Sequence, residues 1–320
     1  MAEPVGDSSA ILDGPGLPGG RIHPRSHWAR VRSFLKLVAI EHSVFALPFA
    51  YLSALTAMTV QSKRINWTDL ALITIAMVGA RTFAMAANRI IDRHIDARNP
   101  RTAGRELVTG AVSVGTAWTG AGVALGVFLV AAAALNPLCL TLAPVAIAPL
   151  VAYPYAKRLT AWPHAILTLA QMVGPLGAWL AVTGTFVGSG PAWVLAAAVG
   201  LWIGGFDLIY ACQDAEIDRV IGVHSVPARY GVGFALRLST AIHVVTFVLF
   251  VWFGELVGLG WLWWIGLGLA AAAFVYEHAI VKPTDLSRVN RAFFTANGFV
   301  GIALFVFALA DLVARLGLRP

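Results

Sequence analysis

Charged residues are scarce in this chain of 320 residues. They make up 12% of the sequence, against about 25% in a typical soluble domain. Apolar types make up 58%, and the mean hydropathy is +0.76. This composition excludes a soluble globular enzyme and an intrinsically disordered chain. It predicts a polytopic membrane protein with its few polar residues gathered on an internal face.

Cysteine is scarce as well. Cys139 and Cys212 fall in apolar runs near opposite ends of different predicted spans, so we expect no disulfide and exclude a disulfide-stapled secreted domain. No Cys and His residues have zinc-site spacing. The N-terminus lacks the basic start of a secretory signal. We predict a disordered or surface-lying cytoplasmic segment over residues 1–33 and a membrane domain over 34–320.

Long apolar runs dominate the rest of the chain. A helix needs about 20 mostly apolar residues to cross a bilayer. The runs predict an all-α membrane protein of about nine spans, or eight if two short neighbours are one. The predicted spans are 34–60, 69–91, 113–134, 138–157, 163–185, 192–213, 234–253, 261–280 and 291–314.

Basic residues account for the net charge of +7 and are unevenly placed. The opposite side of the predicted topology holds only Lys63, Arg64, Arg315 and Arg319. By the positive-inside rule the N-terminus is cytoplasmic, in a cell inner (plasma) membrane. That rule explains the excess without a nucleic-acid partner. Most Lys and Arg fall in segments on the same side: 21–36, 89–105, 157–158, 219–237 and 282–291.

Acidic residues are few, and several of them fall in two short segments in which they are similarly spaced. Positions four apart on a helix share a face, which groups Asn88, Asp92 and Asp96. Asp214 and Asp218 lie within about 20° of Asp207 on the other segment. Each segment ends a long span on the cytoplasmic side. We therefore expect two acidic faces at one membrane level, on the second and sixth helices.

Facing carboxylates need positive charge between them, because burying them unpaired costs several kcal/mol each. Mg²⁺ bridging to a diphosphate would supply it, since Mg²⁺ prefers a few carboxylates with phosphate oxygens. The alternative is a solvated fringe of ion pairs with neighbouring arginines. Those arginines are Arg89, Arg93, Arg98 and Arg219. Other basic groups on the same side suit phosphate oxygens: Arg101, Arg105, Lys157 and Arg158.

Arg81 lies inside a predicted span, on the face of Asn88 and about 16 Å deeper than Asp92. A charge at that depth indicates function. Arg81 could bind the carboxylate or hydroxyl of a small acceptor. The alternative is a structural ion pair, for example with Glu41. Separately, Gly122 and Gly126 form a small-residue pair, from which we expect close helix packing.

Together these residues resemble the UbiA superfamily of intramembrane aromatic prenyltransferases. The resemblance runs from about Phe34 onward and covers the nine-span topology. It rests on motifs that begin at Asn88 (Asn-x-x-x-Asp-x-x-x-Asp), Arg101 (Arg-Thr-x-x-Arg), Tyr153 (Tyr-x-x-x-Lys) and Asp214 (Asp-x-x-x-Asp). The implied fold is a helical bundle around a central cavity that opens to lipid.

The resemblance also implies roles. A polyprenyl diphosphate ionises, and an electron-rich ring attacks the allylic cation. Mg²⁺ and the diphosphate would be held by Asn88, Asp92, Asp96, Asp214 and Asp218. Arg101, Arg105 and Lys157 would contact the diphosphate, with Arg158 beside them. Tyr153 and Tyr210 could stabilise the cation through their rings. Asp207 is also expected to bind substrate. The residues expected to be catalytic are Asp92, Asp96, Asp214, Asp218 and Arg81.

The acceptor stays open at this point. The stretches that begin at Glu41 (Glu-His-x-x-Phe-Ala-Leu-Pro) and Tyr210 (Tyr-Ala-Cys-Gln-Asp) are similar to the subgroup assigned to menaquinone synthesis by the futalosine route. That subgroup implies a dihydroxynaphthoate acceptor, and its members are commonly labelled 4-hydroxybenzoate polyprenyltransferases. Other acceptors, such as a porphyrin, chlorophyllide or sugar phosphate, are the first alternative. A cation-coupled transporter is the second.

Overall fold

The computed structural model describes Phe34, Leu37 and residues 47–320. The predicted segment 1–33 and most of the first predicted span before Leu47 lie outside the described residues. Over the described residues the chain is helical, with no strands. Its elements are α2 (Leu47–Gln61), α3 (Trp67–Asp96), α4 (Glu106–Thr109), α5 (Val114–Leu135), α6 (Pro137–Leu159), α7 (Pro163–Thr183), α8 (Gly190–Ala211), the 3₁₀ turn η2 (Cys212–Asp214), α9 (Ala215–Ile221), α10 (Val226–Tyr230), α11 (Val232–Val257), α12 (Trp261–Ile280), α13 (Val289–Arg291), the π-helical turn η3 (Ala292–Ala296) and α14 (Asn297–Ala314).

Within the described residues, 8 helical segments are long and apolar enough to cross a membrane. They correspond to the second to ninth predicted spans, which confirms the all-α polytopic architecture. Many large apolar side chains point outward, among them Val130, Val145 and Val275. Such a surface is costly in water but suits lipid, so the chain is a multi-pass membrane protein. Cys139 and Cys212 are both free thiols, as expected.

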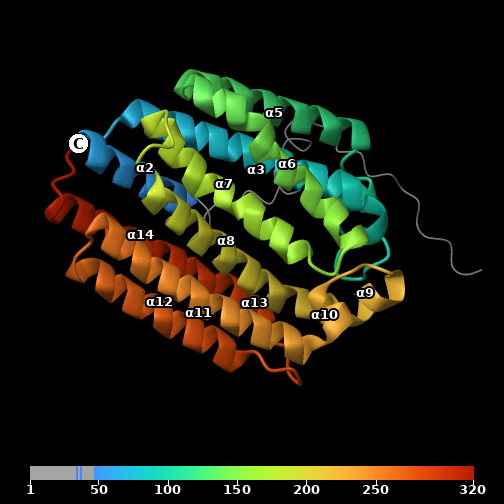
Figure 1. The fold of residues 1–320 in the computed structure, drawn as a ribbon. Helices are drawn as coiled ribbons and strands as arrows, with labels where there is room; N and C mark the ends of the chain where they lie inside the picture. The colour runs from blue at the N-terminus through green and yellow to red at the C-terminus, as the bar shows by residue number, and fades with distance from the viewer. Residues whose placement is uncertain (1–33, 35–36, 38–46) are drawn as a thin grey trace, which may run out of the picture.

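The helices form a bundle in which α2, α7 and α8 lie between two outer groups (Figure 1). On one side α3 packs against α5, and α6 packs against α7. On the other side α11 packs against α8, and α12 against α14. The largest apolar core joins α2, α8, α11, α12 and α14 through side chains such as Phe49, Trp202 and Trp263. Polar residues of α3 and α8 line one cavity, together with residues of α7.

Helix α3 has clear sequence signals at both ends. The Asn66 side chain accepts hydrogen bonds from the backbone N–H groups of Thr68 and Asp69, and so caps its first turn. Arg93 lies in its last turn, where positive charge is favourable. The long, capped helix therefore carries its three polar residues to one end of the bundle.

The expected packing role of Gly122 and Gly126 is wrong. A side chain at either position would meet no atom within 4 Å, because both face outward from α5. The close approach between α3 and α5 occurs instead at Gly79, where a Cβ would lie 3.0 Å from the Ala124 carbonyl oxygen. Small residues permit such contacts only on the face that meets the neighbouring helix.

Candidate active site

The last turns of α3 place the first acidic group. Asp92 is completely buried, and its carboxylate forms an ion pair with Lys157 in the last turn of α6. Arg158 lies 3.6 Å from the other carboxylate oxygen of Asp92. One turn further on, Asp96 pairs with Arg105 at 2.5 Å. The end of α3 is therefore tied to α6 and to the loop that follows α3 itself.

The second group begins where α8 ends. The helix tightens into η2 and resumes as α9, and this local change aims Asp214 at the loop after α3. Arg101 donates to both Asp214 carboxylate oxygens, at 2.9 and 2.5 Å. The Asn99 amide donates to Asp214 at 3.1 Å. The two acidic segments, far apart in sequence, are thereby brought together by one loop.

Asp207 and Asp218 flank this contact. Asp207 lies 2.7 Å from Nδ1 of His164, which is in the first turn of α7. Asp218 is buried and accepts a hydrogen bond of 3.0 Å from Ser225. Ser225 also caps α10 through the N–H of Ala228, so that loop is held to α9. Each aspartate thus has a defined partner from a different element.

These side chains surround a cavity of about 390 Å³. Asp96, Asp214 and Asp218 line it from the two acidic segments. Its polar lining also includes Arg81, Asn88, Arg89, Asn99, Arg101, Arg105, Tyr153, Lys157, His164, Gln171, Asp207, Tyr210, His224 and Ser225. The sequence prediction that two acidic faces share one site is therefore supported by the geometry, and basic side chains lie between them.

In the part of the chain that the structure describes, the aspartates do not pair with the arginines that the alternative interpretation, a solvated fringe of ion pairs, would require. Arg89 donates to the Leu37 carbonyl, Arg98 to that of Ile221 and Arg219 to that of Ala228. Asp92, Asp96 and Asp214 instead form ion pairs with Lys157, Arg105 and Arg101, all three of which line the cavity. Burial alone would lower the pKa of Arg101, but its hydrogen bonds and attraction to Asp214 raise that pKa overall. The guanidinium therefore stays charged and available to an anion.

The donor set fits a magnesium ion. Asp96, Asp214 and Asp218 offer carboxylate oxygens to one cavity, and Asn88 adds an amide. Mg²⁺ favours hard oxygen ligands in this number, completed by phosphate and water. The neighbouring arginines and lysine suit the phosphate oxygens.

A second, smaller and more apolar cavity of about 150 Å³ adjoins the first. Arg81, Asn88 and Tyr153 line both. Nε of Arg81 is buried and makes no hydrogen bond within the described part of the chain. Glu41, the partner considered for a structural ion pair, lies outside the described residues. Arg81 can therefore contact a bound molecule that extends from one cavity into the other.

Two predicted residues stand apart from the cavity. Among the described residues, neither Asp92 nor Arg158 lines it. Arg158 donates a hydrogen bond to the Ile91 carbonyl at 2.5 Å and lies over the ring of Tyr155. It therefore lies on the side of Asp92 that faces away from the cavity and is not placed to hold phosphate. Tyr153 and Tyr210 do line the cavity, and Arg101 lies 5.3 Å from the centre of the Tyr210 ring.

His164 is a cavity residue that the sequence analysis did not identify. Its Nδ1 is held by Asp207, while its Nε2 has no hydrogen-bond partner in the described chain. A neutral histidine held in this way offers Nε2 as a proton acceptor. The signal available in the sequence was a histidine directly after Trp162-Pro163, where a span begins on the cytoplasmic side.

The chain has clear relatives among known proteins. The sequence model of the UbiA prenyltransferase family matches residues 46–299. The 4-hydroxybenzoate octaprenyltransferase of Pseudomonas aeruginosa is 30% identical over 300 residues, which cover 93% of this chain and 98% of that protein. The 4-hydroxybenzoate solanesyltransferase of Synechocystis is 34% identical over 241 residues, covering 73% and 79%.

Solved structures share the fold. A UbiA homologue from Aeropyrum pernix superposes with a TM-score of 0.77 at 36% identity, covering 85% of this chain and 98% of that one. A homologue from Archaeoglobus fulgidus, solved with DMAPP and Mg²⁺, has a TM-score of 0.68 at 18% identity, covering 88% and 99%. The family match spans most of the bundle, including both acidic segments. The chain is therefore a prenyltransferase and belongs to the UbiA prenyltransferase family.

Proposed function

We propose that this chain transfers a polyprenyl group from a polyprenyl diphosphate to a small aromatic acid, with Mg²⁺, in quinone synthesis. The observation that carries the proposal is the polar cavity, in which carboxylates of α3 and α8–α9 face bases that pair with them. The relatives act on 4-hydroxybenzoate by name. A dihydroxynaphthoate is the second acceptor that we include.

The diphosphate binds at the polar end of the cavity in this proposal. Arg101, Arg105 and Lys157 exchange part of their contacts with aspartates for phosphate oxygens. Bound Mg²⁺ neutralises charge that develops on the leaving diphosphate. The bond between C1 of the prenyl chain and the phosphate oxygen breaks, and the ring faces of Tyr153 and Tyr210 stabilise the allylic cation. The metal ion would be held by Asn88, Asp96, Asp214 and Asp218, and by Asp92 once its ion pair with Lys157 opens.

The aromatic acceptor binds deeper. Its carboxylate is held by the Arg81 guanidinium, which can make two parallel hydrogen bonds. Its ring then lies toward the polar cavity, where it attacks C1 of the cation. A new carbon–carbon bond forms, and the proton on the attacked ring carbon must leave. Nε2 of His164, held in the accepting tautomer by Asp207, takes that proton.

We also assign the cavity to the cytoplasmic side of a cell inner membrane, with the N-terminus on that side and residues 34–320 as one membrane domain. The cavity opens among loops rich in Arg and Lys, including Arg98, Arg101 and Arg219. The positive-inside rule supports this orientation. It also places the site where a cytoplasmic aromatic acid and a membrane-borne donor can meet.

Purified protein incubated with Mg²⁺, geranyl diphosphate and either 4-hydroxybenzoate or 1,4-dihydroxy-6-naphthoate tests the proposal. Mass spectrometry should detect a prenylated acid that disappears when EDTA removes divalent metal and returns when Mg²⁺ is added back. The acceptor that turns over identifies the pathway. The proposal fails if folded protein forms no product with either acid, even when longer donors are supplied.

Replacing His164 by glutamine should lower kcat by roughly 10²-fold, because the ring proton then leaves without a positioned base. The affinity for the diphosphate donor should stay unchanged, since the proposed diphosphate contacts are Arg101, Arg105 and Lys157, and His164 is not among them. Steady-state rates over a range of pH measure the effect. His94→Gln, an exposed histidine on α3, is the matched control. A His164 variant with wild-type kcat would remove this residue from the chemistry.

A further inference from the structure

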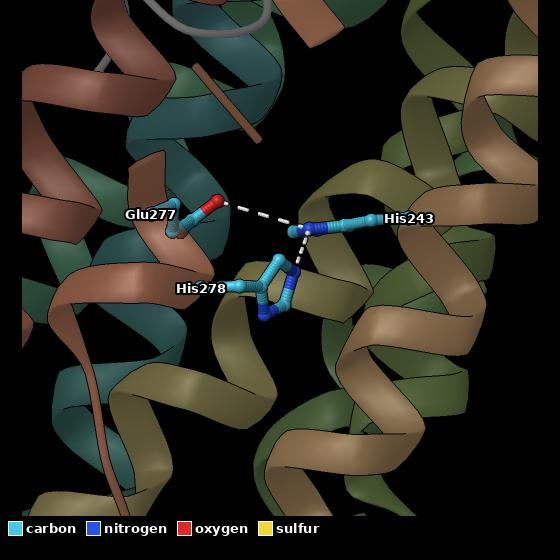
Figure 2. A group of neighbouring side chains, drawn as sticks. All are labelled: His243, Glu277 and His278. Atoms are coloured by element: carbon cyan, nitrogen blue, oxygen red, sulfur yellow. Dashed lines mark hydrogen bonds and ion pairs between the residues drawn. The ribbon is translucent and has the colours of Figure 1, made fainter. Parts of the chain in front are cut away.

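A second group of ionisable side chains lies in the opposite half of the bundle. His243 on α11 meets Glu277 and His278 on α12, and their ligand atoms all lie within 4.8 Å of one another (Figure 2). His243 is 2% exposed and Glu277 0%, while His278 is partly exposed in the last turn of α12. None of the three lines the cavities described above. Charged groups in a membrane-spanning region are expensive and need a defined partner.

The tautomer of His243 follows from its neighbours. Its Nε2 lies 3.2 Å from the backbone carbonyl oxygen of Trp202. A carbonyl oxygen only accepts hydrogen bonds, so Nε2 carries the proton. In a neutral ring, Nδ1 then has a free lone pair. That Nδ1 points at His278, 2.9 Å from its Nε2 (Figure 2).

The tautomer of His278 follows in the same way. The Thr240 hydroxyl donates its one proton to the Leu236 carbonyl at 3.0 Å. With its proton on that carbonyl, Thr240 can accept a hydrogen bond from Nδ1 of His278, which lies 3.2 Å away. Nε2 of His278 is left with a lone pair. Two nitrogen lone pairs then face each other across 2.9 Å, an arrangement that is repulsive unless a cation lies between them.

Glu277 supplies a third acceptor. Trp202 Nε1 donates to Oδ1 of Asn297, which fixes the orientation of that amide. The amide nitrogen of Asn297 donates to Oε1 of Glu277 at 2.9 Å. Oε2 of Glu277 is buried, has no hydrogen-bond donor among the described residues, and lies 3.7 Å from Nδ1 of His243. With these tautomers, two imidazole nitrogens and one carboxylate oxygen converge, and none of the three receives a proton from the others.

We propose that His243, Glu277 and His278 bind a divalent transition-metal ion of the zinc class, at a site separate from the magnesium-type site. Two imidazoles and a carboxylate are an established zinc ligand set, with bonds of about 2.0–2.2 Å. In tetrahedral geometry the ligand atoms lie about 3.3 Å apart. Two of the present separations, 2.9 and 3.7 Å, differ from that value by only a few tenths of an ångström, and all three lie within 4.8 Å, so ion binding would draw Glu277 and His278 closer together.

The surroundings match those of a metal ligand shell. Ligating histidines usually donate their other ring N–H to a backbone carbonyl, carboxylate or other acceptor, as His243 and His278 do here. The position also depends on Gly205 of α8, where a Cβ would lie 2.5 Å from Nε2 of His243. The π-helical turn η3 directly precedes Asn297, and such turns often adjust side chains at functional sites. The ion would join α11 to α12 directly, and α8 and α14 through Trp202 and Asn297.

Metal content of untagged, purified protein tests the site. Protein stripped of metal is equilibrated with Zn²⁺ or Co²⁺, desalted, and measured by mass spectrometry of the metal and by visible absorption of Co²⁺. We expect about one tightly held equivalent per chain, with the absorption of a tetrahedral Co²⁺ site. Asp214→Asn, a variant of the other site, should retain this equivalent. Its retention separates the result from any failure of the proposed function.

Three variants sharpen the test. Glu277→Gln should abolish tight binding, and His278→Ala, at the partly exposed position, makes the same test if Glu277→Gln does not fold. Thr240→Val removes only the acceptor for His278 Nδ1 and should weaken the affinity by roughly 10-fold or more. Wild-type protein that holds no more Co²⁺ than folded Glu277→Gln or His278→Ala would overturn the proposal. The three groups would then share a proton in place of a metal ion.

Discussion

Asp214→Asn is expected to lower prenyl transfer by roughly 10³-fold, the scale of losing a buried electrostatic contact in a catalytic site. Asparagine keeps the size of the side chain but removes the negative charge that faces Arg101 and the proposed metal ion. Asp214 also receives the Asn99 amide, so it is the point where the loop after α3 joins α8. Because asparagine keeps one oxygen that can accept from Asn99 and Arg101, the change should affect ionisation of the donor more than stability of the bundle.

The measurement is kcat with saturating donor and acceptor at several Mg²⁺ concentrations, since a weakened metal site is partly rescued by more metal. Asp285→Asn is the matched control, because Asp285 is an exposed acid in the loop after α12 that contacts Ser287. Asp92→Asn is a second variant, though it leaves Lys157 without its buried partner. If Asp92→Asn and Asp214→Asn both retained full activity in folded protein, the proposed mechanism would be wrong.

Arg81→Met should lower kcat/KM for the aromatic acid by roughly 10²-fold, the value of two charge-assisted hydrogen bonds. Methionine preserves much of the length and apolar contact of the side chain. The donor should bind as before, because Arg81 lies at the junction with the apolar cavity and the diphosphate binds at the polar end. The effect should therefore fall on acceptor use alone.

A comparison of two acceptors isolates the contact. Wild-type protein should prefer 4-hydroxybenzoate to a phenol of similar shape without the carboxylate, and Arg81→Met should largely erase that preference. Arg291→Met, an exposed arginine of α13, controls for loss of a positive charge. Equal losses for both acceptors would show that Arg81 does not bind the carboxylate.

Much of the architecture could be predicted because hydropathy and helix periodicity act locally. The second to ninth predicted spans match the helices within a few residues. Asn88 and Asp96, eight residues apart, share the cavity, whereas Asp92 midway between them does not line it. The assignment of ion-pair partners depended on tertiary contacts. Arg101 pairs with Asp214, more than a hundred residues away in sequence. Arg98, close to Asp96 in sequence, and Arg219, close to Asp218, donate to backbone carbonyls instead.

Other features had no local signal. His164 acquires its role only because α7 packs against α8 and places it beside Asp207. The proposed metal ligands come from two helices, so a search for zinc spacing in the sequence could not find them. Glu277 alone, an acid within an apolar span, was a hint that the sequence offered. The Gly122 and Gly126 prediction failed because residue size does not reveal which face meets a neighbour.

The pairing of acids with bases around the polar cavity makes that region close to electroneutral. A diphosphate that entered alone would leave excess negative charge, and a divalent cation that entered alone would leave excess positive charge. Each should therefore bind more tightly in the presence of the other, and thermodynamic reciprocity requires the two enhancements to be equal. The size of this cooperativity would depend on the free energy needed to open three ion pairs. These are Lys157–Asp92, Arg105–Asp96 and Arg101–Asp214.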